Sequence, residues 1–410
     1  MFHKIIIIGA GASGIMAAIT CKDFGEDAAI IEGQNRIGKK LLITGNGRCN
    51  ISNINTKPSR YHSHNKDFFI PVLEAFNCRD TKEFFEGLGL PLTTLDDGKM
   101  YPMSLQASSV IDILRFSLDE RSIPIYLNTN VIEIEKLSKG FKIITNSNEE
   151  FTCEKVILAS GGTSASNTGS NGSGYRLAKK LGHEIITPIP ALVQLKLNYD
   201  HLKALSGVKF NGFVEIYIDN NLKGKDFGEI LFTDYGISGP PILQLSRIAS
   251  LGVFNKSHVT IKLDLIPNLS DENLKDYLYN HFGIFSYRSV MDSFIGIINK
   301  KIIPILLKQA GVSDIHKPCM DLTWQEKSKI ITLLKHWEFQ VTDTNSFSNA
   351  QITAGGVNTK QVNSSTLESN IVKNLFFCGE VLDVDGDCGG FNLQWAWSSG
   401  FAAAKSACNK

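Results

Sequence analysis

The chain has 410 residues, of which 43% are hydrophobic and 20% charged, and its formal net charge is only +1. This composition describes a soluble globular protein of two or three domains and excludes a disordered chain. The net charge of the whole chain does not indicate nucleic-acid binding, which would therefore need a local basic patch. The eight cysteines are scattered without a C-x-x-C pair. We therefore expect no metal site, no disulfide framework and a cytoplasmic location.

The N-terminus has the apolar character of a targeting segment. The stretch MFHKIIIIGAGASGIMAAITCKD passes for a signal peptide, but its glycines lie where a phosphate-binding turn needs them. No small-residue cleavage site follows. No other stretch reaches the roughly 18 uninterrupted apolar residues that cross a bilayer. We expect no membrane association.

The first 32 residues carry a dinucleotide-binding βαβ pattern. Branched apolar residues at 5–8 predict a buried parallel strand, and the turn GAGASG at 9–14 follows at once. Residues 15–21 then predict a helix, and 28–31 a second strand that ends at Glu32. Strand, glycine turn, helix, strand and acid are all in register, which makes the pattern specific.

Each residue of the glycine turn has a physical task. Gly9 permits the tight turn, Gly11 lets the backbone approach a pyrophosphate, and Gly14 lets helix and strand pack closely. The unpaired amides near Ser13 and the positive end of the helix dipole attract phosphates. Glu32 accepts hydrogen bonds from ribose hydroxyls and repels a 2′-phosphate. The turn predicts FAD or NAD.

Two later segments favour FAD. KVILASGG at 155–162 predicts another buried strand that ends in small residues. NLFFCGEVLD at 374–383 predicts a strand followed by Gly-Glu, which FAD enzymes of the glutathione-reductase-like class use to hold the ribityl chain. GSNGSG at 169–174 follows no strand, so it is no second fingerprint. We expect a tightly bound FAD, with NAD(P)H as a transient reductant.

The segment Gly33–Lys66, here called the basic window, carries positive charge only. It holds seven Lys or Arg residues, two His and no acid. Arg36, Lys39 and Lys40 come soon after the second strand, where positive charge offsets a pyrophosphate. In related flavoproteins the chain then runs toward the isoalloxazine ring, so residues 44–50 are expected to line the active site.

The outer half of the basic window has no FAD phosphate left to serve. Its cationic residues are Lys57, Arg60, His62, His64 and Lys66. A polyanionic substrate such as RNA explains them, because phosphate contacts supply much of the affinity in RNA binding. A solvated loop and a small anionic substrate are the alternatives.

Long motifs along the chain resemble successive signatures of one family. They are KKLLITGNGRCNISN (39–53), TGSNGSGYRLAKKLGH (168–183), GEILFTDYGISGPPILQLS (228–246), TAGGV (353–357) and CGEVLDVDGDCGGFNLQWAWSSG (378–400). On these motifs the chain resembles the bacterial YhiN/BaiN/RdsA-like FAD-dependent flavoproteins, from Lys4 to about Ala404. The resemblance implies FAD and reductase chemistry. One branch makes dihydrouridine in large-subunit ribosomal RNA, and another is implicated in reducing conjugated double bonds of bile acids.

The predicted fold class is α/β, with a Rossmann-like FAD domain of the glutathione-reductase-like kind interrupted by an insert. The FAD domain is expected at 1–190 and 348–410, an antiparallel β-barrel or sandwich at 191–267 with about 338–347, and a helical subdomain at 268–337. Alternation of apolar and polar residues at 259–265 predicts an antiparallel strand with one wet face. Thr323-x-x-Glu326 predicts a capping box that opens a helix.

A further helix is predicted from Phe391 onward, after Gly389-Gly390. The resemblance places its N-terminus at the pyrimidine edge of the flavin. Its free amides and dipole would stabilise the anionic reduced ring, and Asn392 is a polar contact to that ring. A plain alanine-rich terminal helix is the alternative.

The full set of predicted FAD contacts follows from these motifs. It comprises Gly9, Gly11, Ser13, Gly14, Glu32, Gly33, Lys39, Lys40, Thr44, Gly45, Asn50, Gly161, Gly162, Gly379, Glu380, Gly390, Phe391, Asn392 and Leu393.

Reduction of a C=C bond also needs a proton donor. Cys49 is one candidate, since a thiol with the ordinary pKa of ~8.5 is protonated at neutral pH. A buried apolar cysteine is the alternative. Arg48 is expected to orient a substrate carbonyl or phosphate. His62, His64 and Tyr101 are further candidates for the acid.

We therefore predict an FAD-dependent oxidoreductase that reduces an electron-poor C=C bond with hydride from flavin N5. The preferred substrate is a uridine of large-subunit ribosomal RNA, unpaired or flipped out of its stack. The alternatives are a reductase of small enones such as steroid or bile-acid intermediates, a non-catalytic flavin-binding RNA-associated factor, and an amine oxidase.

Overall fold

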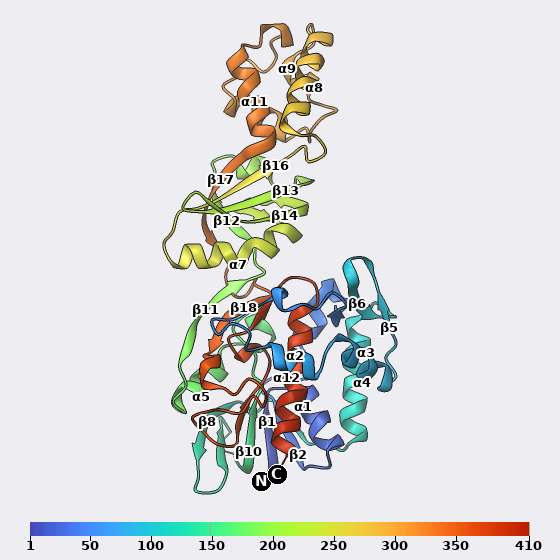
Figure 1. Ribbon diagram of the computed structural model, residues 1–410, viewed down its shortest axis with the longest axis vertical. Helices are drawn as coiled ribbons and strands as arrows, with labels where there is room; N and C mark the ends of the chain where they lie inside the picture. The colour runs from blue at the N-terminus through green and yellow to red at the C-terminus, as the bar shows by residue number, and fades with distance from the viewer. Residues whose placement is uncertain (148, 410) are drawn as a thin grey trace. The chain divides into compact units, whose positions relative to one another are not determined.

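The computed structural model describes residues 1–147 and 149–409, which divide into two compact units (Figure 1). The first unit joins Met1–Ile189 to Ala350–Lys410, and the second is Pro190–Asn349. Each unit has its own hydrophobic core. The first unit is therefore assembled from both ends of the chain, and a continuous insert builds the second.

The central sheet of the first unit has the strand order β7-β2-β1-β10-β9-β8, with β19 also paired to β10. The strands are β1 (Phe2–Ile8), β2 (Ala28–Ile31), β7 (Ile125–Tyr126), β8 (Val131–Lys136), β9 (Phe141–Thr145), β10 (Glu150–Leu158) and β19 (Leu375–Phe377). β7, β2, β1, β10 and β19 run parallel, whereas β10, β9 and β8 form antiparallel hairpins. The long strand β10 serves both arrangements, because its first half pairs with β9 and its end with β19.

The parallel strands are buried because helices cover them. Residues 5–8 of β1 are almost completely buried, as their run of isoleucines predicts. Helix α1 (Ala12–Asp23) packs against α12 (Phe391–Cys408), and the two lie side by side (Figure 1). Gly400 permits this close approach, since a Cβ there would lie 2.5 Å from the carbonyl oxygen of Ser13.

Short strands connect the basic window to other parts of the first unit. β4 pairs with β20, and β3 pairs with β6, which also pairs with β5. The bounds are β3 (Ser52–Asn53), β4 (Tyr61–His62), β5 (Leu92–Thr94), β6 (Lys99–Pro102), β11 (Ile185–Ala191), β18 (Ile352–Val357) and β20 (Asp385–Gly386). The remaining helices of this unit are α2 (Ile70–Ala75), α3 (Cys78–Gly87), α4 (Ala107–Glu120) and α5 (Ser173–Lys180).

The second unit contains a closed antiparallel barrel with the strand order β12-β15-β14-β13-β16-β17. The strands are β12 (Leu195–Asn198), β13 (Lys209–Ile218), β14 (Asn221–Phe232), β15 (Gly236–Ser238), β16 (Val259–Asp264) and β17 (Trp337–Thr344). α6 (Leu202–Leu205) and α7 (Pro240–Phe254) belong to the same part of the chain. The parallel sheet and this barrel confirm the predicted fold class, with the barrel rather than the sandwich as the insert.

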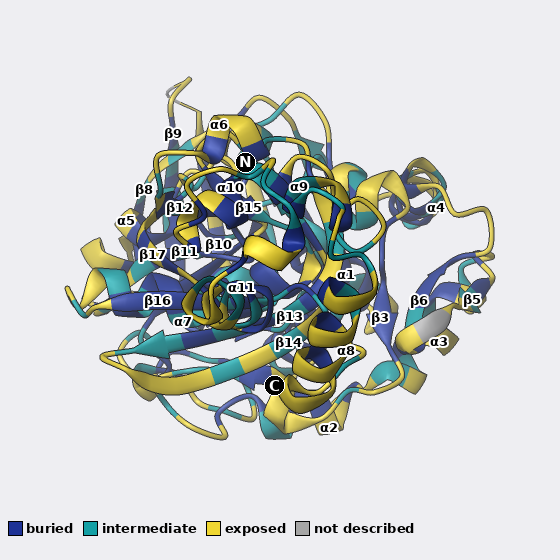
Figure 2. Ribbon diagram, turned by 90° about the horizontal axis from the view of Figure 1, so that it is seen from above, coloured by how far each residue is buried: buried dark blue, intermediate teal, exposed yellow. Residues whose placement is uncertain are grey.

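Four α-helices lie between the barrel strands β16 and β17 in the chain. They are α8 (Asp271–Ile284), α9 (Val290–Ser293), α10 (Ile302–Gln309) and α11 (Trp324–His336). The predicted capping box is present, because Thr323 Oγ1 accepts from the Glu326 N–H (3.2 Å) and the carboxylate accepts from the Thr323 N–H (2.8 Å). In Figure 2, β16 is largely dark blue, and α8 turns an exposed face outward. Within the described residues, no helix combines the length and apolarity that a membrane crossing needs.

Candidate functional site

The candidate site lies in the first unit, at the carboxyl edge of its parallel strands. β1 ends at the turn that begins with Gly9, Glu32 directly follows β2, and Gly379 lies two residues after the end of β19. Loops at this edge of an open α/β sheet bind ligands, because the strands deliver several loop backbones to one crevice.

The glycine turn has the shape that a pyrophosphate requires. Gly9 has φ +111°, and a Cβ there would lie 2.6 Å from the carbonyl oxygen of Ala159. A Cβ on Gly14 would overlap the carbonyl oxygen of Gly9. A Cβ on Gly11, by contrast, would meet no atom of the described residues within 4 Å. The turn is therefore tight where strand meets helix and open where a ligand would approach.

The start of α1 offers unpaired amides beside a fixed carboxylate. Helical hydrogen bonding begins at Ile15, whose N–H donates to the carbonyl of Gly11 (2.9 Å), so the amides just before it point outward. Glu32 accepts from the N–H of Ala10 (2.7 Å) and from that of Gln34 (2.8 Å). These bonds fix the carboxylate next to the turn.

The C-terminal segment reaches the same turn. Gly379 has φ +77°, and a Cβ there would overlap Oγ of Ser13 in the first turn of α1. The indole N–H of Trp395 donates to the carbonyl of Gly379 (3.1 Å). The two segments predicted to hold one FAD are therefore in contact.

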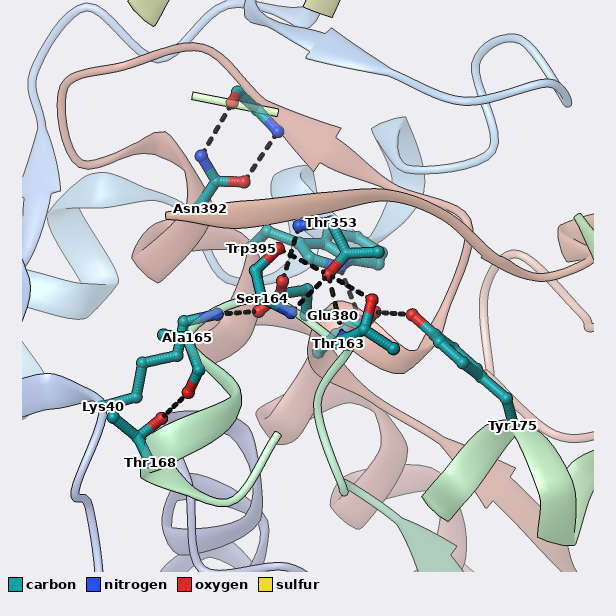
Figure 3. A network of polar contacts seen from close by, with 12 residues as sticks. Lys40, Thr163, Ser164, Ala165, Thr168, Tyr175, Thr353, Glu380, Asn392 and Trp395 are labelled. Carbon is teal, nitrogen blue, oxygen red and sulfur yellow. Dashed lines mark hydrogen bonds and ion pairs between the residues drawn. The ribbon is translucent and has the colours of Figure 1, made fainter. Parts of the chain in front are cut away.

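Glu380 lies at the centre of a polar network (Figure 3). Its carboxylate pairs with Lys40 Nζ (2.7 Å) and accepts from the N–H of Thr353 (2.8 Å). Oγ1 of Thr353 accepts in turn from the N–H groups of Thr163 (2.9 Å) and Ser164 (3.0 Å). Lys40 and Glu380, both predicted as FAD contacts, thus bind each other, and the network joins their loops to those of Thr353 and Thr163.

Other predicted FAD contacts also have partners within the protein. Lys39 Nζ donates to the side-chain oxygen of Gln34 (2.8 Å). The hydroxyl of Thr44 donates to the main-chain carbonyl three residues earlier (2.7 Å). A side chain on Gly33 would overlap that of Asn130.

The N-terminus of α12 presents a second group of unpaired amides. Gly390 precedes the helix with φ +98°, and the N–H of Gln394 donates to its carbonyl (3.0 Å). The amides of residues 391–393 therefore precede the helical hydrogen bonding. This is the start that the sequence predicts, and it makes the positive end of the dipole available to an anionic ring.

The side chain of Asn392 binds the backbone of the loop in front of α12 (Figure 3). Its Oδ1 accepts from the N–H of Gly386 (2.8 Å), and its Nδ2 donates to the carbonyls of Gly386 (2.7 Å) and Asp387 (3.2 Å). These bonds occupy the carboxamide. Asn392 therefore holds the loop in front of α12, and a contact of this residue with the flavin ring stays a prediction.

The side-chain oxygen of Asn50 is an unpaired hydrogen-bond acceptor near the start of α12. Its Oδ1 is buried and has no hydrogen-bond partner among the described residues. A Cβ on Gly390 would lie 2.9 Å from this oxygen. The pyrimidine ring of a flavin carries an N–H that satisfies such an acceptor and carbonyl oxygens that satisfy free amides. The residues present thus fit an FAD that extends from the start of α1 to the start of α12.

Acidic residues from the C-terminal segment pair with three of the five residues of the outer basic window. Arg60 Nη1 lies 3.2 Å and His62 Nε2 2.9 Å from the carboxylate of Asp387. His64 Nδ1 lies 3.1 Å from the carboxylate of Asp383, which is fully buried. Together with the Lys40 pair, these contacts join the basic window to residues 380–387, here called the acidic loop.

The acidic loop explains why the basic window is one-sided. The loop contains Glu380 and three aspartates and no Lys or Arg, so the two segments are complementary in charge. The sequence suggested an external polyanion as the partner of Arg60, His62 and His64, whereas in the structure they have carboxylate partners within the chain. Lys57 and Lys66 are exposed and form no ion pair with the described residues. The predicted RNA-binding surface thus retains two free cations of its five.

Cys49 is sealed inside the first unit. Its side chain is 0% exposed, and its backbone has φ +59°. Burial raises the pKa of the thiol to about 12, against a hydrogen bond from Thr44 that lowers it. A side chain that solvent does not reach cannot deliver a proton to a substrate, so the structure favours the buried apolar cysteine over the catalytic acid.

Burial of Cys49 has a consequence for stability at high pH. Because burial raises the pKa of this thiol to about 12 in the folded protein, above its ordinary value, the thiol contributes stability that is present below about pH 9 and lost as the pH rises toward 12. In the wild type, the titration of this thiol makes the unfolding free energy fall by up to about 1.4 kcal/mol per pH unit in that range. We expect Cys49→Ser to remove this contribution, so that the free energy falls less steeply with pH. Urea unfolding at several alkaline pH values measures this slope, and an equal slope in both proteins would contradict the burial.

Arg48 and Tyr101 form a pair beside Cys49. The guanidinium carbon of Arg48 lies 5.1 Å from the centre of the Tyr101 ring. Arg48 Nε also donates to the carbonyl of Gly45 (3.4 Å). A Cβ on Gly45 would lie 3.2 Å from the edge of the same ring. The predicted loop residues thus gather around a tyrosine on β6.

Sequence reasoning gave no role to Thr353, Asp383 or Asp387. All three belong to motifs that carried the family resemblance, TAGGV and CGEVLDVDGDCGG. The signal for the aspartates was present, because the acidic loop has the sign of charge that the basic window lacks. No comparable signal marks Thr353, whose role depends on a backbone contact with Glu380.

Comparison with known proteins agrees with this geometry. The family model described as the HI0933-like protein Rossmann domain matches residues 3–406. The 3-dehydro-bile acid delta(4,6)-reductase of Clostridium scindens is 38% identical over 410 residues, which is 100% of both chains. The ribosomal RNA dihydrouridine synthase of Haemophilus influenzae is 30% identical over 411 residues, 99% of this chain and 98% of that one.

A solved structure shares the fold over its whole length. The 3-ketosteroid delta1-dehydrogenase from Sterolibacterium denitrificans superimposes with a TM-score of 0.50 at 12% identity, covering 99% of each chain. At this identity the likeness concerns the fold alone. The family match and the relatives decide the assignment: the chain belongs to the HI0933-like family and is an FAD-dependent oxidoreductase.

Proposed function

We propose that this protein reduces a C=C bond conjugated to a carbonyl group, and that its substrate is a small enone of the steroid class. One observation supports the small substrate over RNA, namely the pairing of Arg60, His62 and His64 with the acidic loop. A phosphate backbone binds to cations that are free to replace its counterions, and these side chains already have carboxylate partners. The proposal reverses the sequence-based preference for a ribosomal uridine.

The relatives support both the chemistry and the choice. The relative that is 38% identical is named for a bile-acid substrate, and the one that is 30% identical for ribosomal RNA. A uridine and an enone steroid share a C=C bond conjugated to a carbonyl, so one flavin site suits either. The two substrates differ in charge, so the number of unpaired cations near the site decides which of them the protein favours.

FAD, when bound, supplies the hydride. We propose that the open turn at Gly11 and the amides at the start of α1 bind its pyrophosphate, and that Glu32 binds its ribose. The amides of residues 391–393 would hold the pyrimidine edge and stabilise negative charge there. The Lys40–Glu380 pair would keep the two halves of this site together. NAD(P)H is the proposed source of electrons.

Anaerobic turnover tests the proposal. The flavin-loaded protein is reduced chemically and mixed with 4-androstene-3,17-dione, and the products are identified by mass spectrometry. We expect the steroid to gain two hydrogen atoms while oxidised flavin absorbance returns. The rate should change little between about 50 and about 200 mM salt, whereas turnover on RNA would fall by orders of magnitude.

Lys57 and Lys66 provide the matched control for the alternative substrate. Changing both to Gln removes the free cations of the outer basic window and should leave enone turnover unchanged. A reduced protein that no conjugated enone reoxidises, but that a uridine-containing ribosomal RNA fragment does, would overturn the proposal. Loss of that RNA turnover in the double variant would then assign the lysines to RNA binding.

A further inference from the structure

The proposed reaction needs a proton donor that the structure has so far not supplied. Cys49 is sealed from solvent. His62 and His64 face the carboxylates of Asp387 and Asp383. Tyr101, in contrast, remains available in the group of residues around Arg48.

The strand that carries Tyr101 is tied to the start of α12. β6 pairs with β3 through Ser52 and Asn53, and the N–H of Ile51 donates to the carbonyl of Met100 (2.8 Å). The carbonyl oxygen of Ser52 would lie 2.5 Å from a Cβ on Gly390, the residue that precedes α12. Tyr101 is therefore held close to the helix end proposed to bind the flavin ring.

The hydroxyl of Tyr101 is a free donor. It makes no hydrogen bond to the described residues, although the side chain as a whole is only 5% exposed. Tyr61 is a useful contrast, because its hydroxyl also lacks a partner among those residues but is buried from solvent. A neutral phenol that retains access to solvent and has no internal acceptor is able to donate to a bound molecule.

Arg48 adds a positive charge that the protein leaves uncompensated. Lys40 and Arg60 pair with carboxylates, whereas Arg48 has no carboxylate within 4.0 Å among the described residues. Its guanidinium lies against the Tyr101 ring. A planar, permanently charged group in this position suits an oxygen that gains negative charge during a reaction.

We propose that Tyr101 is the catalytic acid and that Arg48 binds the carbonyl oxygen of the substrate. FAD, when bound and reduced, would supply the hydride for the new C–H bond at the β-carbon, and the electron pair of the C=C bond would then move toward the carbonyl oxygen to give an enolate. Arg48 holds the enolate oxygen. The phenol proton of Tyr101 then moves to the α-carbon, and water returns a proton to the phenolate. This assignment rests on the proposed function.

Tyr101→Phe tests the acid directly. We expect the variant to keep its flavin and its melting temperature and to lose about 100-fold or more in the rate at which the enone reoxidises the reduced protein. Tyr61→Phe is the matched control, because it makes the same change in a tyrosine whose ring lies 6.1 Å from that of Phe391, and it should keep the wild-type rate. Cys49→Ser should keep it as well.

Two further readouts separate catalysis from a packing role. Titration with the saturated ketone product, followed by flavin absorbance, should show about 10-fold weaker binding to Arg48→Gln and a smaller loss for Tyr101→Phe. Site-specific 3-fluorotyrosine at position 101 retains the ring and makes the phenol more acidic. It should therefore move the alkaline limb of the rate profile to lower pH, whereas a packing role would leave that limb unmoved.

The possible failures are distinguishable. If the wild type and Tyr101→Phe reduce the enone at equal rates, Tyr101 is not the catalytic acid. The proposed function is then unaffected. An unmoved pH profile with fluorotyrosine overturns this role of Tyr101 too, even where the Phe variant folds poorly. Failure of the wild type itself to reduce any enone overturns the proposed function and, with it, the role of Tyr101.

Discussion

Gly14→Ala is expected to give a protein that is purified without flavin and melts well below the wild type. The added Cβ would overlap the carbonyl oxygen of Gly9 and lie 3.3 Å from Cβ of Ala159. Because the first obstacle is backbone, α1 must shift on β1, at a cost of about 1–3 kcal/mol or more. The same shift displaces the amides that we propose to bind the pyrophosphate. Thermal unfolding and the flavin content of the purified protein measure both effects.

Gly11→Ala is the matched substitution in the same turn. Its Cβ would meet no atom of the described residues within 4 Å, so the apoprotein should unfold within about 0.5 kcal/mol of the wild type. The methyl group would nevertheless occupy the space that the pyrophosphate needs, and FAD affinity should fall at least about 10-fold. Unchanged affinity in Gly11→Ala would show that the pyrophosphate does not lie at this turn.

Glu380→Ala should have the second large effect. It leaves the Lys40 amine and the Thr353 N–H without their acceptor in a partly buried site, which we expect to cost about 2–3 kcal/mol of unfolding free energy. Because Lys40→Met removes the same ion pair, the double variant should be more stable than the sum of the single losses predicts, by about 1–2 kcal/mol. Urea unfolding of the apoproteins gives this coupling energy.

Lys39→Met is the control for the ion pair. Lys39 adjoins Lys40 but donates to the neutral side chain of Gln34. Its replacement should cost under about 0.5 kcal/mol and show no coupling to Glu380. Equal costs for the two lysines, or no coupling between Lys40 and Glu380, would contradict the role given to the acidic loop.

Local patterns made the glycine turn and its neighbouring carboxylate predictable. The turn at Gly9, Gly11 and Gly14 and the acid Glu32 act within one βαβ unit, so their spacing alone specifies their geometry. The start of α12 follows in the same way from the glycines before Phe391. The barrel was predictable in kind, because its strands alternate apolar and polar residues.

Contacts between distant segments were not predictable from spacing. His62 and Asp387 are 325 positions apart, and nothing near either residue specifies that they meet. The sequence therefore showed an unbalanced basic segment and suggested an external polyanion, although the balancing carboxylates lie in the same chain. Cys49 illustrates the same limit, since its burial depends on residues that the loop motif does not contain.

Hydrogen–deuterium exchange of the apoprotein and the FAD-loaded protein tests the central claim most directly. The claim is that one FAD extends from the unpaired amides at the start of α1 to those at the start of α12. We expect FAD to slow exchange in peptides covering residues 9–14 and in those covering 390–394 together, with the same dependence on FAD concentration. Protection of one segment alone, or a protein that does not take up FAD, would contradict the account.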